Sequence, residues 1–235
     1  VLTWHEIVND TVGGTPVAVT YCPLCNAALV FERRLNGKAV EFGTTGKLRR
    51  SDLIMYDRDT ESWWQQFSGE AIVGDAVGMK LKLVPSRLES FANFKKRAPD
   101  GKVLVPTTPK MRRYGDNPYV GYDSSNVPFL FRGELPKYIP AMERVVVVRR
   151  DNESPLIVSM QHVRDQGSFE RDGVMLSWSA GQTSALDSAD IAKGRDVGNI
   201  VAQTQVDGKA EAVPYDVTFA FVAHSFHPDV RIIQN

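Results

Sequence analysis

Short runs of β-branched and aromatic residues alternate along the chain with turns rich in glycine, asparagine and aspartate. Runs of this kind, roughly four to eight residues long, predict β-strands. The predicted strands in the first part of the chain cover residues 16–21, 28–32, 39–43, 52–57, 61–67, 70–74 and 81–84. Asn36 and Gly37 stand between two of these runs, and this dipeptide favours a tight hairpin turn. The pattern therefore indicates a series of antiparallel hairpins.

Helical patterns are few. Residues 88–97 form the best candidate, with Ser86 as the expected N-cap, and a short helical turn is expected over residues 4–9. Residues 106–140 are rich in proline, glycine and aromatic side chains, and they predict a long ordered loop. We therefore predict a β-dominated α+β fold, in which short antiparallel strands and hairpins form a sandwich- or barrel-like core with few helices.

A weak internal likeness links the two parts of the chain. Residues 17–22 resemble residues 174–179, and each stretch follows a short apolar segment at a similar distance. Within a single domain of residues 1–235, this likeness is either the trace of an internal duplication or a chance similarity. The pseudo-repeat halves would then be residues 1–145 and 146–235.

The charge balance limits the classes of partner. Lysine plus arginine and aspartate plus glutamate number 28 each, so no net field favours nucleic acid or an anionic membrane. No apolar run approaches the roughly 18–20 residues that a membrane-spanning helix needs. Neither a phosphate-binding loop nor a dinucleotide fingerprint is present, so no nucleotide cofactor is indicated. The chain begins at Val1 without a signal-type apolar segment, and we expect a processed or trimmed form.

The two cysteines of the chain stand together in the sequence Cys22-Pro23-Leu24-Cys25. Their spacing suits a redox dithiol, one side of a metal site, or a pair of small buried or disulfide-linked residues. In thioredoxin-like proteins the first cysteine begins a helix, whose N-terminus lowers the thiol pKa. Here the residues after Cys25 predict a strand, so a thioredoxin fold is not expected.

A metal site would need ligands from outside the cysteine pair, because the chain has no second pair with which to build a four-cysteine site. The histidines are His5, His162, His224 and His227. If residues 224–227 are extended, the rings of His224 and His227 point to opposite faces, so at most one of them reaches a shared ion. His5 precedes the cysteines closely enough to fold back beside them. Thiolate and imidazole ligands suit one transition-metal ion, zinc or copper.

Several longer motifs follow one another along the chain. They cover residues 4–10, 21–26, 42–48, 55–66, 69–74, 114–119 and 226–229. In this order they resemble domain-of-unknown-function family 3179 (DUF3179), and the resemblance extends from residue 1 almost to the C-terminus. Members occur in bacteria and archaea, and many look exported or lipid-anchored, so the resemblance implies an extracytoplasmic setting. It implies no reaction. The family tends to be more aromatic just before its last motif than this chain is, and we therefore favour His227 over His224 as a site residue.

Three hypotheses about function remain open. The first is a metal-binding protein in which Cys22 and Cys25 supply thiolates and His227 and His5 supply nitrogen ligands; a metalloenzyme of this kind would keep one coordination position open. The second is a thiol–disulfide redox protein of non-thioredoxin fold. The third is a non-enzymatic structural or assembly subunit, whose loop of residues 106–140 and strand edges contact another protein.

Further polar and aromatic side chains are candidates for a small-molecule pocket. The candidate pocket residues are Glu6, Asp57, Arg58, Trp64, Gln66, Tyr114, Asp116 and Tyr119. Asp57 and Arg58 offer charge-assisted hydrogen bonds to a ligand, or they serve an ion pair that closes their hairpin. Glu6 stands beside His5, where it can orient an imidazole or act as a base; the alternative, which we favour, is a solvated side chain in the N-terminal turn. For Trp64 the alternative is packing in the core.

Overall fold

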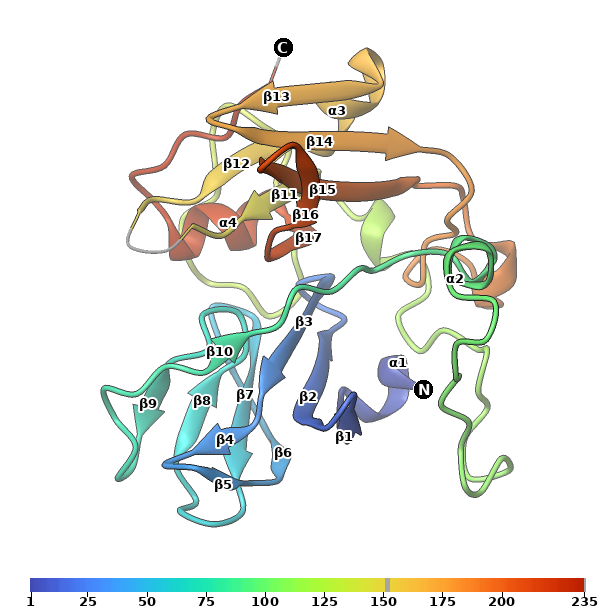
Figure 1. The fold of residues 1–235 in the computed structure, drawn as a ribbon. Helices are drawn as coiled ribbons and strands as arrows, with labels where there is room; N and C mark the ends of the chain where they lie inside the picture. The colour runs from blue at the N-terminus through green and yellow to red at the C-terminus, as the bar shows by residue number, and fades with distance from the viewer. Residues whose placement is uncertain (151–152, 235) are drawn as a thin grey trace.

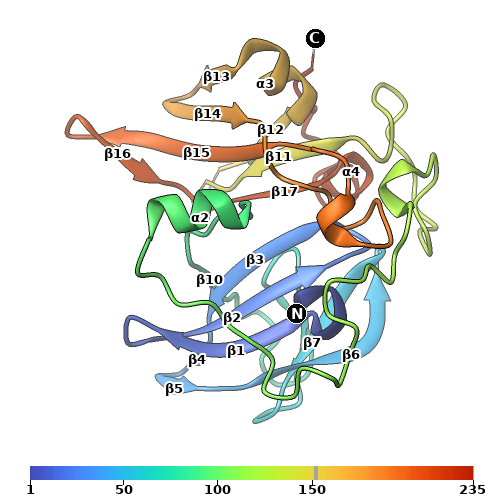
Figure 2. The same ribbon diagram turned by 90° about the vertical axis from the view of Figure 1, so that its right-hand side faces the viewer.

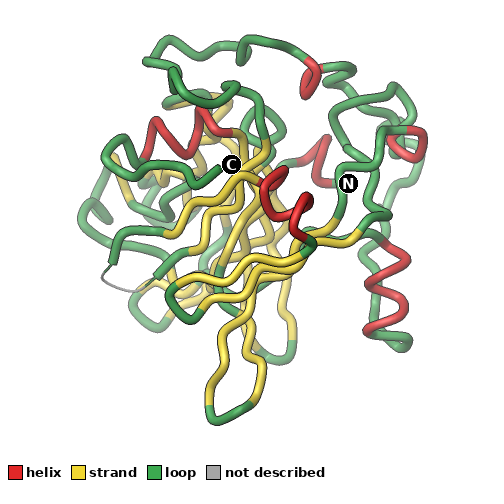
Figure 3. The backbone as a smooth tube through the Cα atoms, turned by 90° about the horizontal axis from the view of Figure 1, so that it is seen from above, coloured by secondary structure: helices red, strands yellow, loops and turns green. Residues whose placement is uncertain are grey.

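The computed structural model describes residues 1–150 and 153–234. Within these residues, four larger antiparallel sheets are arranged like the blades of a four-bladed propeller, and a two-stranded hairpin is attached to them (Figure 1). Sheets from the first half of the chain lie below those from the second half in that view. Seen from above, the strands run through the middle of the molecule and long loops pass around the outside (Figure 3).

Two of the sheets come from the first half of the chain. Their strands are β1 (Ile7–Val12), β2 (Thr15–Cys22), β3 (Ala27–Glu32) and β10 (Lys82–Leu83) in one sheet, and β6 (Phe42–Arg49), β7 (Asp52–Asp57), β8 (Trp63–Gln65) and β9 (Ala71–Val73) in the other. The attached hairpin consists of β4 (Arg34–Leu35) and β5 (Lys38–Ala39). β7 is buried along nearly its whole length, which places it inside the core.

The other two sheets come from the second half. Their strands are β11 (Arg144–Val148), β12 (Leu156–Ser159) and β17 (Tyr215–Phe219) in one sheet, and β13 (Ser168–Arg171), β14 (Val174–Ser179), β15 (Asn199–Val206) and β16 (Lys209–Ala212) in the other. The aliphatic run of β11 is fully buried, as expected for a strand covered on both faces.

Helical segments are short. They are α1 (Leu2–His5), α2 (Phe91–Arg97), α3 (Met160–Gln166) and α4 (Ala220–Phe226), with 3-10 turns η1 (Tyr122–Ser124) and η2 (Ile191–Lys193). Among the described residues, no helix is both long enough and apolar enough to cross a membrane.

The predicted fold class is confirmed. Antiparallel hairpins dominate, helices are few, and the turn at Asn36 and Gly37 forms with φ angles of 50° and 81°. The predicted strand over residues 52–57 coincides with β7. Residues 106–140 contain η1 and otherwise form the predicted loop.

The predicted helix boundaries are partly wrong. The helix cap is Ser90 and not Ser86, because Ser90 has extended backbone angles and its side chain accepts a hydrogen bond from the N–H of Asn93 at 3.3 Å. The helical turn expected over residues 4–9 lies earlier, at α1, and β1 follows it directly. Capping geometry decides the boundary at Ser90, whereas α1 has no side-chain cap and its C-cap is Glu6, whose φ angle is 60°.

Of the two hydrophobic clusters, the larger combines residues of both halves, and the smaller consists of second-half residues such as Leu176 and Ile200. β3 of the first half faces β17 of the second (Figure 2). The larger buried cluster contains Phe31 and Trp64 from the first half together with Val147 and Phe219 from the second. Each half also contains a helix followed by an antiparallel meander, α1 before β1–β2–β3 and α3 before β13–β14–β15. An origin by duplication stays a prediction.

Candidate functional site

The cysteine pair lies in the loop that joins β2 to β3. Cys22 ends β2 and pairs with Ala27 at the start of β3. The loop turns tightly, because the N–H of Cys25 donates to the carbonyl of Cys22 at 3.2 Å and the N–H of Asn26 donates to that of Pro23 at 3.2 Å. Asn26 adopts φ 54°, which asparagine tolerates better than most residues. This turn places the two sulfur atoms 3.1 Å apart.

Elements from outside the hairpin hold this loop in place. The carbonyl of Cys25 accepts hydrogen bonds from the hydroxyl of Thr218 at 2.7 Å and from the N–H of Phe219 at 3.2 Å, both in β17. The hydroxyl of Tyr122 donates to the carbonyl of Leu24 at 2.9 Å. The conformation of the loop therefore depends on later parts of the chain as well as on its own sequence.

The turn between β6 and β7 faces the cysteines. Arg50 and Ser51 alone form this turn, with φ angles of 57° and 64°. Two-residue turns with both φ angles positive usually contain asparagine or glycine, so this turn is strained. The carbonyl oxygen of Ser51 lies 3.3 Å from the sulfur of Cys25 and 3.8 Å from that of Cys22. The strained turn thus directs a carbonyl at both thiols.

Asp52 completes a group that we call the Cys–Asp cluster: Cys22, Cys25 and Asp52. One donor atom from each lies within 4.8 Å of the other two, and Oδ1 of Asp52 is 3.2 Å from the sulfur of Cys25. Oδ2 of Asp52 accepts hydrogen bonds from the N–H of Phe67 at 2.8 Å and from the side-chain amide of Gln65 at 2.5 Å. Cys22 is 2% exposed, and Cys25 and Asp52 are 0% exposed. The cluster is therefore sealed from solvent.

Burial makes all three groups hold their protons more tightly. It raises the pKa of Asp52 to about 6, although the hydrogen bonds from Phe67 and Gln65 oppose the rise. It also raises the pKa of both thiols, most strongly that of Cys25. Without a cation, both thiols are protonated at neutral pH.

The donor set suits a sulfur-binding metal ion. Two thiolates and one carboxylate carry three negative charges when deprotonated, and buried charge of this kind is stable only beside a cation. Zinc accepts thiolate sulfur at about 2.3 Å and carboxylate oxygen at about 2.0–2.2 Å in tetrahedral sites. Three protein ligands leave one position for the carbonyl of Ser51, for water or for a substrate.

The histidines predicted as ligands lie in other surroundings. Nε2 of His5 is 2.8 Å from the hydroxyl oxygen of Tyr114, and the two rings stack. The ring centroid of His227 lies 6.1 Å from that of Phe67, and burial lowers the pKa of His227 to about 4. Within the described residues, neither histidine belongs to the Cys–Asp cluster. Their role as ligands stays a prediction.

Asp57, Arg58 and Trp64 shape one hairpin. The indole N–H of Trp64, which is fully buried, donates to Asp57 at 2.9 Å, and the backbone N–H of Thr60 also donates to Asp57 at 2.6 Å. Arg58 approaches Glu41 at 3.8 Å instead of pairing with Asp57. The contacts of Asp57 and Trp64 are thus structural, and a ligand-binding role for these residues stays a prediction.

Gln66 lies beside the cysteine loop. Its side-chain N–H₂ group donates to the hydroxyl of Thr20 at 2.9 Å and to the carbonyl of Ala27 at 3.2 Å. Ala27 is the strand partner of Cys22. Gln66 therefore supports the hairpin that carries the cysteines.

The remaining candidate pocket residues lie around α1. Asp116 pairs with Arg113 at 2.7 Å, and its carbonyl accepts the indole N–H of Trp4 at 3.2 Å. Burial raises the pKa of Glu6 and of Tyr119. Tyr114 contacts His5, as described above. The structure thus groups these residues together, and their functional role stays a prediction.

A protein-family model matches nearly the whole chain. A family model described as "Protein of unknown function (DUF3179)" matches residues 1–230. The chain belongs to this family. Searches of curated proteins and of solved structures found no match. Membership of DUF3179 confirms the resemblance that the motifs indicated, and it leaves the chemistry of the site to be argued from geometry.

Asp52 is the member of the Cys–Asp cluster that sequence patterns did not indicate. The pattern predicts only a buried strand over residues 52–57. One signal was available: Asp52 opens an apolar run, Leu53-Ile54-Met55, and a carboxylate in a buried strand needs partners. Its closeness to the cysteines follows from the packing of two hairpins, which periodicity does not specify.

Proposed function

We propose that this protein binds one transition-metal ion, zinc or copper, through the sulfur atoms of Cys22 and Cys25 and a carboxylate oxygen of Asp52. The observation that carries the proposal is the buried approach of three donor atoms, all within 4.8 Å of one another. Sulfur ligands favour zinc or copper over magnesium or calcium, which prefer oxygen. Metal binding would offset the cost of burying these groups, because the ion takes them in their deprotonated form.

Hydrogen bonds around the cluster support a pre-organised site. The N–H of Phe67 and the amide of Gln65 orient the carboxylate of Asp52, as outer-layer partners commonly orient metal ligands. Burial raises the pKa of Cys22, and the backbone N–H groups of Leu53 and Cys25 oppose that rise by favouring the thiolate. We therefore expect the ligands to move little when an ion binds. An open fourth position would suit catalysis, whereas coordination by the carbonyl of Ser51 would suit storage or a structural role.

Thiol–disulfide exchange is a second candidate function. It is favoured by the 3.1 Å between the two sulfur atoms and by the 3.2 Å between Asp52 and the sulfur of Cys25. In this exchange Cys22 and Cys25 would form a disulfide and pass two electrons and two protons to a partner disulfide, which leaves as two thiols. Asp52 would accept the proton of Cys25 and pass it to the departing thiolate of the partner, so that both protons leave with the two partner thiols. Both sulfurs are buried, so the loop would have to open first.

Elemental analysis tests the metal proposal. Reduced, untagged protein is loaded with zinc or copper(I), freed of excess ion and analysed. We expect about one ion per chain, because all three ligands are present in a single site. The Cys22→Ser/Cys25→Ser double variant should lose the ion, and Asp52→Asn should bind it more weakly.

His5→Ala and His227→Ala serve as matched controls. Both should retain the ion if the Cys–Asp cluster supplies the ligands, whereas loss of the ion in either variant would add that histidine to the ligand set. Retention of a full complement of metal by the double cysteine variant would overturn the proposal. Absence of bound metal combined with reversible oxidation of the cysteine pair in glutathione buffers would favour the redox candidate.

We also propose an extracytoplasmic setting, on the strength of the resemblance to exported and lipid-anchored members of DUF3179. Fractionation of cells that carry the native gene tests it. Recovery of the protein in the exported or membrane-anchored fraction is expected, and recovery in the cytoplasm alone would contradict the proposal.

A further inference from the structure

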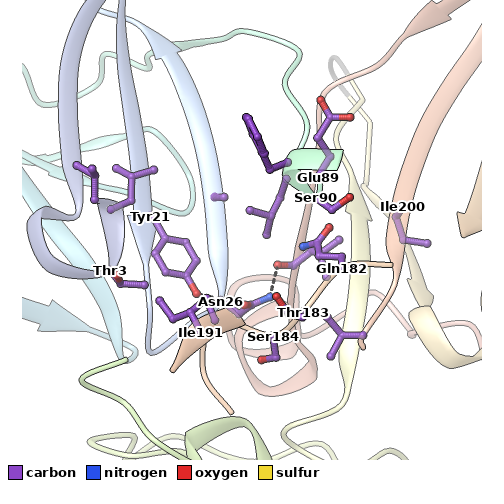
Figure 4. A pocket seen from close by; sticks show the side chains of 18 of the residues that line it. Thr3, Tyr21, Asn26, Glu89, Ser90, Gln182, Thr183, Ser184, Ile191 and Ile200 are labelled. Atoms are coloured by element: carbon purple, nitrogen blue, oxygen red, sulfur yellow. Dashed lines mark hydrogen bonds between the residues drawn. The ribbon is translucent and has the colours of Figure 1, made fainter. Parts of the chain in front are cut away.

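A cavity of about 670 Å³ lies against the first sheet, bounded also by the segment that enters α2 and by loops of the second half (Figure 4). Val19 and Tyr21 of β2 line this cavity. Successive side chains of a strand point to opposite faces, so Thr20 and Cys22 point away from it. On that other face the hydroxyl of Thr20 meets the side chain of Gln66 at 2.9 Å. The cavity and the Cys–Asp cluster therefore occupy opposite faces of one strand.

Most of the cavity wall is aliphatic. The aliphatic lining includes Val8, Val19, Ala28, Leu88, Val197 and Ile200. Phe91, Val103 and Leu104 also line it and remain 64%, 55% and 53% exposed, so they lie at its rim. Cavities of roughly 300–1,000 Å³ with largely apolar walls and a few polar groups are typical of small-molecule sites. The wall thus suits a hydrocarbon chain.

Polar groups gather where the cavity meets the cysteine hairpin. The hydroxyl of Tyr21 donates to Oδ1 of Asn26 at 3.3 Å, a long hydrogen bond that a stronger acceptor could replace. Nδ2 of Asn26 donates to the carbonyl of Val217 at 3.1 Å (dashed line in Figure 4). Burial raises the pKa of Tyr21, so its hydroxyl remains a neutral donor.

Arg144 supplies the positive charge of the lining. Its Nη2 donates to Asp123 at 2.7 Å and to Ser184 at 2.9 Å. Asp123 is shared with Arg195, which lies 3.1 Å from the same carboxylate oxygen. In the part of the chain that the structure describes, no hydrogen bond is found from Nε or Nη1 of Arg144. These N–H groups are available to a ligand.

We propose that this cavity binds an amphipathic monocarboxylate, with its hydrocarbon tail along the aliphatic wall and its carboxylate between Arg144 and Tyr21. Arginine pairs with carboxylates through strong, charge-assisted hydrogen bonds. Glu89, an acidic side chain of the lining, lies across the cavity from Asn26 and Ser184 (Figure 4) and is paired with Arg97. The negative charge of Glu89 is therefore neutralised by Arg97, and it lies away from the position proposed for the ligand's carboxylate.

Calorimetric titration with octanoate, decanoate and dodecanoate tests the proposal. The titrations contain a chelator, so their outcome does not depend on whether the Cys–Asp cluster binds metal. Each added methylene should strengthen binding roughly fourfold until the cavity is filled, because a buried methylene contributes about 0.8 kcal/mol. Decanol has the same tail without the charge, and it should bind at least about tenfold more weakly than decanoate. Equal affinity for decanol, or no binding of any carboxylate, would overturn the proposal.

Two variants of lining residues, Ala28→Leu and Tyr21→Phe, locate the ligand, and Ala39→Leu is the control. Ala28→Leu fills space in the cavity and should abolish binding, whereas Ala39→Leu, on the exposed hairpin strand β5, should bind normally. Tyr21→Phe should weaken the binding of decanoate about tenfold and leave the binding of decanol unchanged, because only the carboxylate accepts a hydrogen bond from the hydroxyl of Tyr21. Circular dichroism checks that Ala28→Leu and Tyr21→Phe fold. If Ala28→Leu does not fold, the decanoate affinity of Tyr21→Phe decides whether the ligand lies in the cavity. Decanoate affinity that neither variant changes would place the ligand outside the cavity and refute the proposal.

Discussion

The slope of the logarithm of zinc affinity against pH gives the number of protons that the Cys–Asp cluster releases when zinc binds. Near neutral pH both thiols are protonated, because burial raises the pKa of Cys22 and Cys25. Asp52, with its pKa at about 6, is mostly ionised there. Zinc binds the deprotonated forms, so binding near pH 7 should release two protons and binding below about pH 6 should approach three.

The magnitude follows from this count. Each released proton makes the affinity change about tenfold per pH unit, which corresponds to 1.36 kcal/mol. The dissociation constant for zinc should therefore fall about 100-fold for each unit of pH rise near neutrality, or roughly 3 kcal/mol. Toward pH 5 the dependence should steepen, because Asp52 must then lose a proton as well.

Competition with a chromophoric chelator, under a reductant and across pH 5 to 7.5, measures this slope. In Cys25→Ser, zinc binding near neutral pH should release about one proton. In Asp52→Asn, it should release about two protons even near pH 5. Asp52→Asn is a suitable variant because the amide oxygen of the new side chain still accepts hydrogen bonds from Phe67 and Gln65. A slope near zero or one in the unaltered protein would refute the assignment of both thiols as ligands.

Three further predictions concern stability. In the metal-free protein the raised pKa of Asp52 favours its protonated form, so the contribution of Asp52 to stability should be greatest below about pH 4 and fall by about 3 kcal/mol as pH rises through 6. The difference in unfolding free energy between the unaltered protein and Asp52→Asn, measured in urea titrations across this range, should show that fall. Zinc at about 100 times its dissociation constant should stabilise the fold by about 2.7 kcal/mol and raise Tm by roughly 5–10 °C, and an unchanged Tm would argue against binding to the folded state. Leu176 is fully buried in a smaller hydrophobic cluster with Val158 and Ile200, so Leu176→Ala should lower the free energy of unfolding by about 2–5 kcal/mol in chemical denaturation while leaving zinc affinity unchanged.

Local patterns predict much of the fold. The strand over residues 52–57 and the turn at Asn36 and Gly37 follow from side-chain type and turn chemistry, which act over a few residues. The helix N-terminus is harder to predict, because Ser86 and Ser90 are both suitable caps. The choice of Ser90 accompanies a contact with Asn199, whose side chain accepts the N–H of Ser90 at 2.9 Å.

The candidate site is predictable only in part. Cys22 and Cys25 stand out because they are the only cysteines and belong to one short motif. Asp52 joins them through the packing of one hairpin against another, and the turn that makes this possible uses Arg50 and Ser51 with positive φ angles of 57° and 64°. Neither residue type indicates such a turn, since glycine or asparagine is the usual signal.

X-ray absorption at the zinc edge of the loaded protein identifies the atoms that surround the ion, and therefore whether the Cys–Asp cluster binds it. We predict two sulfur neighbours at about 2.3 Å together with oxygen or nitrogen neighbours at about 2.0–2.2 Å. In Asp52→Asn the two sulfur neighbours should persist while the shell of light atoms changes. A spectrum with only oxygen and nitrogen neighbours would contradict binding of the ion by Cys22 and Cys25.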